Sequence, residues 1–233
     1  MKIAKHPYFI IIPALAVLIF LGTPTLSGQT IMQIKSQIGS AWQSYPIGFP
    51  NSSEQSIRHY GFSAEILRRL NPKVAVGIAP GFMRRGTEFE VGFINGFSIG
   101  PPRFRSQLFL NYVQLPVLLR AETPVLRGLG VYFQSGVGFS YLLGGYRQAT
   151  AQTSGFPTSR LELDFDGRDQ ELNRFDFGWQ GSLGLTYPLG KGKLAVSGEF
   201  YYGFCDVDQK NTSKNRNWGV GLGYQFLLRK NKD

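Results

Sequence analysis

The stretch Asn217-Trp-Gly-Val-Gly-Leu-Gly-Tyr-Gln-Phe-Leu-Leu228 shows the pattern that the rest of this chain repeats. Its even positions carry large apolar side chains, whereas its odd positions up to Gln225 are small or polar. This period of two predicts a β-strand with one apolar face. The side chains on the second face are very small. Glycine destabilises a strand unless its position requires it, and the crowded interior of a tightly curved barrel would require small residues there. An apolar exterior over a small, polar interior indicates a barrel surrounded by lipid.

Seven further stretches repeat this alternation, at residues 34–42, 60–70, 73–82, 106–121, 129–143, 175–187 and 194–204. Eight strands predict an all-β fold, a closed antiparallel, up-and-down transmembrane β-barrel. The connections alternate between long (44–55, 84–105, 144–174, 206–216) and short (71–72, 122–128, 190–192), as external loops and periplasmic turns do. Pro116 would be awkward in a central ladder, so we expect a bulge there. A soluble sandwich or lipocalin-like barrel is the alternative, and it would need polar outer faces.

The N-terminus has the pattern of an export signal. Lys2 and Lys5 precede an apolar run over 8–21, which breaks at Gly22-Thr23-Pro24 and reaches small residues at Ser27 and Gly28. The run is short for a membrane span, which favours a cleaved signal peptide over a retained anchor helix. We therefore predict a signal peptide at residues 1–28 and an outer-membrane β-barrel domain at residues 29–233.

The composition narrows the partners. The net charge is +10, but the chain has no basic helix, zinc-ligand spacing or RNA-binding aromatic motif, so we expect no nucleic acid partner. An anionic membrane surface suits this charge better, and outer-membrane lipids are the expected partners of a monomeric barrel. The single cysteine, Cys205, excludes an internal disulfide. We expect no cofactor.

Charged residues also occur at positions whose parity points them into the barrel. Buried charges must be paired or hydrogen-bonded. We therefore predict an internal ionic network in which the two glutamates have Arg or Lys partners, within a barrel too narrow to conduct. Its members are Lys35, Glu65, Arg69, Arg120 and Glu199.

Aromatic residues of the opposite parity gather near strand ends. Interfacial girdles of membrane proteins have this composition. We predict a lipid-facing aromatic belt of Trp42, Tyr60, Tyr141, Phe175, Trp179, Tyr187, Phe204, Trp218, Tyr224 and Phe226.

Catalytic and metal-binding patterns are sparse. His59, the one histidine beyond the signal, shares its parity with Ser63 and Glu65, which would be the elements of a nucleophile and its base. The plainer interpretation is a loop-end histidine at the membrane interface. One His and one Cys far apart make no transition-metal site. The acidic segment over 161–171 could hold Ca²⁺ but lacks EF-hand spacing. We expect no catalytic residues and no metal.

The run Tyr112-Val-Gln-Leu-Pro-Val-Leu-Leu-Arg120, with Val131-Tyr-Phe-Gln-Ser-Gly-Val-Gly-Phe-Ser-Tyr-Leu-Leu143, resembles the PorT-type outer-membrane β-barrel family. The resemblance implies an eight-stranded barrel in the outer membrane of a Gram-negative cell, with no shared active site. Some members assist a secretion and gliding machinery. We therefore expect a structural or interaction role through the loops, with secretion-machinery or other cell-envelope proteins as further partners. An accessory barrel of a type IX-like secretion machinery and a lipid-modifying enzyme are the alternatives.

Overall fold

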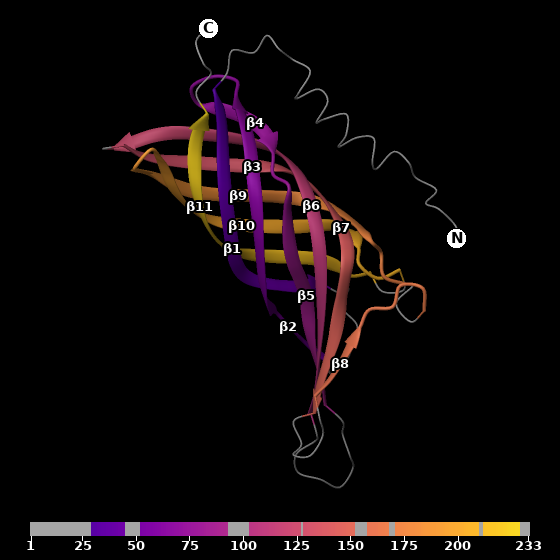
Figure 1. Cartoon of the computed structure of the whole chain (residues 1–233). Coiled ribbons are helices and arrows are strands. Elements are labelled where there is room, and N and C mark those ends of the chain that lie inside the picture. The colour runs from indigo at the N-terminus through magenta and orange to yellow at the C-terminus, as the bar shows by residue number, and fades with distance from the viewer. Residues whose placement is uncertain are drawn as a thin grey trace.

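The structure is a computed structural model that describes residues 29–44, 52–92, 103–126, 128–151, 158–167, 171–209 and 212–228. These residues form a sheet that closes on itself (Figure 1). Within them, no helix is long and apolar enough to cross a membrane. The predicted signal peptide lies outside the described residues. The strands are β1 (Thr30–Ser44), β2 (Ser52–Gln55), β3 (Ile57–Arg69), β4 (Val74–Ile78), β5 (Gly81–Gly92), β6 (Arg103–Leu126), β7 (Leu129–Ala151), β8 (Ser159–Glu162), β9 (Phe175–Leu189), β10 (Gly192–Asp206) and β11 (Lys214–Leu228).

Strand β1 closes the barrel because it pairs with β3 on one side and with β11 on the other. Ile38 lies opposite both Tyr60 and Val220, and every strand pairing is antiparallel. Strands β4 and β5 keep one register against β6, with Ile78 opposite Val117 and Gly81 opposite Gln114. They are therefore two parts of one wall strand. The ring runs β1, β3, β4 with β5, β6, β7, β9, β10 and β11. This confirms the predicted eight-stranded antiparallel barrel.

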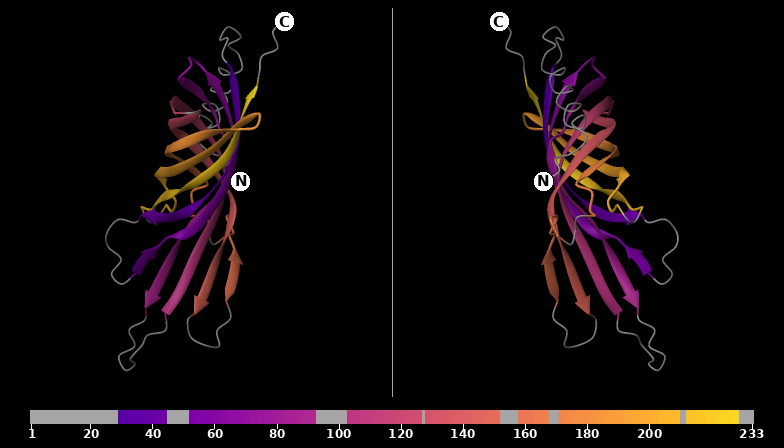
Figure 2. Two further views of the ribbon diagram at one scale, coloured as in Figure 1. Left: turned by 90° about the vertical axis from the view of Figure 1, so that its left-hand side faces the viewer. Right: turned by 90° about the vertical axis from the view of Figure 1, so that its right-hand side faces the viewer.

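The wall is taller on one side than the sequence predicts. Strand β5 continues to Gly92 and β6 begins at Arg103, so most of the predicted connection over 84–105 is strand. Strand β7 likewise continues to Ala151 and pairs with the short β8. These extensions project past the other strands (Figure 2). Their outward faces carry polar residues such as Asn111 and Gln107, so the apolar alternation that predicts a membrane strand is missing there.

The expected bulge at Pro116 is wrong. Pro116 pairs in register with Gly138, and its carbonyl accepts a hydrogen bond from the Ala79 amide at 3.1 Å. Pro116 has no N–H to donate, but this does not shift the strand register. The neighbouring wall strand is itself interrupted at this level, between β4 and β5, where Pro80 also lacks an N–H. The bulge lies at Leu143 instead, since Asn111 faces Gly144 whereas Tyr112 faces Leu142.

The outer face is apolar and the inner face is polar. On β11 the Trp218 and Leu222 side chains are 58% and 54% exposed, whereas Gln225 is fully buried. This excludes the soluble-barrel alternative, whose outer face would be polar. Small residues let the wall close tightly: at Gly39 of β1, an added Cβ would meet the backbone of β11. The predicted turn between β9 and β10 also forms, with Gly190 at a φ of 59° that favours glycine.

Candidate functional site: the barrel interior

Four of the charges predicted to face inward meet inside the barrel. Lys35 of β1 lies between two carboxylates, with Nζ 2.7 Å from Glu65 Oε1 of β3 and 2.8 Å from Glu199 Oε1 of β10. Arg120 of β6 completes this central cluster, 3.9 Å from Glu65 Oε2. The Glu65 and Arg120 side chains are each only 1% exposed. Four strands that are distant in sequence are thus joined across the interior by opposite charges.

Neutral groups complete the shell of Arg120. Its guanidinium carbon lies 3.8 Å from the ring centroid of Tyr132. One guanidinium nitrogen donates to Gln33 Oε1 at 2.9 Å, and the other donates to Gln225 Oε1 at 3.4 Å. Stacking on a ring and two forked hydrogen bonds are interactions that a planar guanidinium makes and an ammonium does not. Arg120 is therefore held in one orientation.

The ionic contacts continue toward the end of the barrel that carries the short turns β3–β4, β6–β7 and β9–β10, which we call the short-turn end. Glu122 Oε2 lies 3.8 Å from Arg120, and Glu122 Oε1 lies 2.7 Å from Lys193 Nζ. Arg69 lies apart: it donates to Gln29 Oε1 at 3.3 Å and forms no ion pair with any described residue. Three cations and three carboxylates thus form ion pairs in this half of the interior, and Arg69 acts on Glu122 only from beyond salt-bridge distance.

A second buried ion pair lies nearer the long loops, and sequence reasoning missed it. Arg85 of β5 donates to Asp176 Oδ2 of β9 at 3.1 Å, and both side chains are almost fully buried. Arg85 also lies 3.8 Å from the Tyr201 ring centroid and donates to Gln114 at 3.3 Å. Asn215 donates to Asp176 Oδ2 at 2.9 Å. We call these five residues the loop-side cluster.

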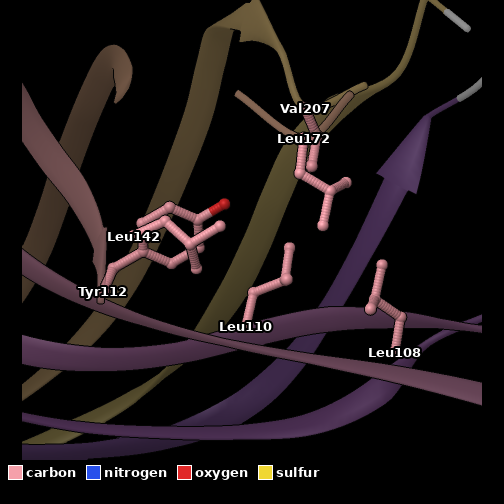
Figure 3. Close-up of a cluster of buried hydrophobic side chains, with 6 residues drawn as sticks. All are labelled: Leu108, Leu110, Tyr112, Leu142, Leu172 and Val207. Carbon is pink, nitrogen blue, oxygen red and sulfur yellow. The ribbon is translucent and has the colours of Figure 1, made fainter. Parts of the chain in front are cut away.

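An apolar cap closes the barrel above the loop-side cluster. Its members are Leu108, Leu110, Tyr112, Leu142, Leu172 and Val207. Leu172 and Val207 come from two loops and lie side by side over the β6 residues (Figure 3). The loops are tied together because the Asn173 amide donates to the Val207 carbonyl at 2.8 Å. A second apolar cluster fills the short-turn end, formed by Ile31, Leu67, Ala75, Ala79 and Leu118.

The space left between the two ionic clusters is small. A cavity of about 40 Å³ lies between Lys35, Glu65 and Glu199 on one side and Arg85 and Gln114 on the other. This volume holds only a few water molecules. Side chains therefore fill the described interior, with the two ionic clusters on either side of this cavity, as expected for eight strands.

His59 lies inside the barrel, so its interpretation as a loop-end histidine at the membrane interface is wrong. Its side chain is 1% exposed, and Nε2 is 3.0 Å from the Trp218 carbonyl oxygen. The ring lies against Gly39 and Gly219, where an added Cβ would collide with it. Its one hydrogen bond within the described residues is thus to the backbone of β11, and the ring packs where two strands approach closely.

The aromatic residues predicted to face lipid all lie on the outer face. Tyr187 and Trp218 are 57% and 58% exposed. Tyr141 packs edge-on against Phe175 at 4.9 Å between ring centroids, and Tyr224 does the same with Phe226 at 4.8 Å. The remaining members, Trp42, Tyr60, Trp179 and Phe204, have the same outward parity. Their role as an interfacial belt stays a prediction.

No cluster of three or more metal-ligating residues occurs in the described part of the chain. In the acidic segment, Asp164 Oδ1 accepts a hydrogen bond from the Asp166 amide at 3.2 Å, as in an ordinary polar turn.

Several solved structures have a similar arrangement of strands. Ail, the attachment invasion locus protein of Yersinia pestis, is 14% identical with a TM-score of 0.41, over 85% of this chain and 99% of that one. OprG from Pseudomonas aeruginosa is 13% identical with a TM-score of 0.42, over 86% and 97%. Neisserial surface protein A is 9% identical with a TM-score of 0.41, over 84% and 97%. No curated protein sequence matches the chain.

Residues 32–209 match the family model described as outer membrane protein beta-barrel domain. The match covers the strand ring from β1 to the end of β10. The chain therefore belongs to the outer membrane protein beta-barrel domain family, and the protein lies in the outer membrane as an eight-stranded β-barrel.

Proposed function

We propose that this protein is a closed, non-conducting barrel that acts through its extracellular loops and periplasmic turns, as a monomer in contact with outer-membrane lipids. The filled interior carries this proposal. The central cluster and the loop-side cluster occupy the middle of the barrel, and apolar residues block both ends. Among the described residues, the extension formed by β5, β6, β7 and β8 projects past the other strands, and we assign protein partners to it.

Conductance in planar lipid bilayers tests the closed state. We expect the refolded wild-type barrel to give no stable channel steps. A variant that loosens the loop-side half of the interior, Arg85→Ala with Leu172→Ala, serves as the comparison, because it removes a large buried side chain and part of the cap. Stable conductance of the wild-type protein, equal to that of this variant, would contradict the proposal.

Site-specific photo-crosslinking on intact cells tests the interaction role. A photo-reactive residue at Leu161 of β8, which is 47% exposed, would report on the extension. The matched control is Leu222 of β11, which is 54% exposed on the apolar wall. We expect discrete protein adducts at position 161 and lipid adducts at position 222. Equal yields of protein adducts at both positions would argue against a partner-binding extension.

A narrower version of the proposal is an accessory barrel of a type IX-like secretion machinery. The PorT-type resemblance over 112–143 supports it. Residues of that motif also build the barrel itself: Tyr112 accepts a hydrogen bond from Asn215 at 3.1 Å, and Arg120 belongs to the central cluster. The motif therefore fits any barrel with this interior. Co-purification of secretion components with the tagged protein, and loss of secreted cargo on its deletion, test the narrower role.

We propose no enzymatic activity. The alternative of a lipid-modifying enzyme rested on His59, whose ring packs between β1 and β11 and binds a backbone carbonyl. His59→Ala is therefore expected to leave the lipid A profile of the cell unchanged. An altered profile, with the barrel still folded, would restore the enzymatic alternative.

A further inference from the structure

An exposed arginine, Arg174, lies at the long-loop end of β9 and forms no ion pair with another described residue. The Arg174 guanidinium carbon is 4.9 Å from the Tyr141 ring centroid and 4.7 Å from that of Phe165. Its backbone is fixed because the Leu142 amide donates to the Arg174 carbonyl at 2.7 Å. No carboxylate of the described residues lies within salt-bridge distance of this guanidinium. Two aromatic rings thus position a positive charge whose hydrogen-bond donors bind no other side chain of the described residues and can face an external anion.

An apolar groove of about 420 Å³ is lined by Tyr141, the residue whose ring Arg174 contacts, and by Phe175, which follows Arg174 in the chain. It forms where β9 loses one neighbour: pairing with β10 ends at Gly178, whereas pairing with β7 continues to Phe175. The groove lies mainly over outward-facing side chains of β6, β7 and β9, including Val113, Leu115, Phe139, Tyr141 and Phe177. The volume of the groove is within the range of small-ligand sites. The groove lies on the lipid-facing side of the barrel.

The positions of Arg174 and of the groove along the barrel axis indicate what kind of ligand would fit both. The long loops of outer-membrane barrels are extracellular, so Arg174 lies on the outer-leaflet side of the groove. A ligand that satisfies both parts has an anionic head toward the cell exterior and an apolar chain toward the middle of the membrane. Guanidinium groups bind phosphate oxygens by charge-assisted hydrogen bonds.

We propose that Arg174 and this groove bind one phosphorylated lipid of the outer leaflet. The phosphate contacts the Arg174 guanidinium, and an acyl chain lies along the groove between Val113 and Phe177. The Tyr141 ring joins the two parts, since it supports the guanidinium on one side and lines the groove on the other.

Native mass spectrometry of the full barrel tests the site. The protein would be released from nanodiscs of phosphatidylcholine that contain a small fraction of lipid A, and the retained lipid A would be counted. We expect Arg174→Gln to reduce retention about tenfold, through the loss of charge-assisted hydrogen bonds. Val113→Trp, which fills the groove from the lipid side, should reduce retention similarly. Lipid A that lacks its phosphates should be retained poorly by the wild-type barrel. Its retention should match that of intact lipid A by the Arg174→Gln variant.

Arg216→Gln is the matched control. Arg216 also stacks on a tyrosine, 4.4 Å from the Tyr202 ring centroid, but it lies on β11 away from the groove. It should retain lipid A as the wild type does, and a gel shift on heating would verify that every variant is folded. Equal retention by wild type and Arg174→Gln would overturn the proposal. An equal loss in Arg216→Gln would also overturn it, because diffuse charge attraction and not this site would then hold the lipid.

Discussion

The two ionic clusters inside the barrel hold buried charge in different ways. In the central cluster, Lys35 is shared by Glu65 and Glu199, so removal of this one cation takes the nearest partner from two carboxylates and leaves Glu65 only Arg120, at 3.9 Å. In the loop-side cluster, Arg85 has a single carboxylate partner, Asp176, and its other contacts are neutral groups and aromatic rings. We infer that a charge surrounded by rings and amides depends less on any one partner than a charge held in an ion lattice.

The largest effect is expected for Lys35→Met, which keeps the length of the side chain and removes its charge. Two buried carboxylates would lose their shared partner, and breaking a buried pair costs about 3–5 kcal/mol. Urea unfolding in lipid vesicles at neutral pH, followed by tryptophan fluorescence, would measure the free energy of unfolding. A cost under about 1 kcal/mol would mean that Glu65 and Glu199 do not depend on Lys35.

A smaller effect is expected for Asp176→Asn in the loop-side cluster. Arg85 would keep Gln114, Ser140 and the Tyr201 ring, so we expect a loss of about 1–3 kcal/mol in the same unfolding measurement. If Asp176→Asn lowered the free energy of unfolding as much as Lys35→Met does, Arg85 would depend on its one carboxylate partner as strongly as the central cluster depends on Lys35.

Arg120→Lys separates shape from charge in the central cluster. The charge beside Glu65 would remain, but the stacking on Tyr132 and one of the two hydrogen bonds to Gln33 and Gln225 would be lost. We expect a cost of about 1–2 kcal/mol. An unchanged free energy of unfolding would show that only the charge of Arg120 contributes to stability.

The smallest effect is expected for Arg69→Gln. Arg69 has the inward parity but lies outside the ion lattice, with one hydrogen bond to Gln29. We expect a change within about 0.5 kcal/mol, as for most surface substitutions. A loss comparable to that of Arg120→Lys would place Arg69 within the central cluster.

The part of the fold inside the apolar belt could be predicted from the sequence. Alternation there has one physical cause, because lipid demands apolar side chains on every second residue. The same parity assigned Lys35, Glu65, Arg120 and Glu199 to the interior, and geometry then brought these four together. The parity of a residue does not give its height along the barrel axis. The predicted ionic network therefore includes Arg69, although this residue lies at the end of β3.

The rest required the three-dimensional structure. Arg85 was missed because the predicted strand ended before it, although the inward parity of Gly77, Gly81 and Met83 continues to Arg85. Extending the strand by parity alone would have found it. The apolar cap had no such signal, because Leu172 and Val207 lie in loops without a repeating pattern and meet only after the barrel closes.

Tryptophan fluorescence in brominated lipid tests whether the apolar face of the barrel is outside and its charges are inside. The chain has three tryptophans, Trp42, Trp179 and Trp218, and all three have the outward parity. For the native protein in vesicles, we predict strong quenching by brominated phosphatidylcholine and little quenching by aqueous iodide. Fluorescence that brominated lipid leaves unchanged and iodide quenches would contradict the assignment of the two faces.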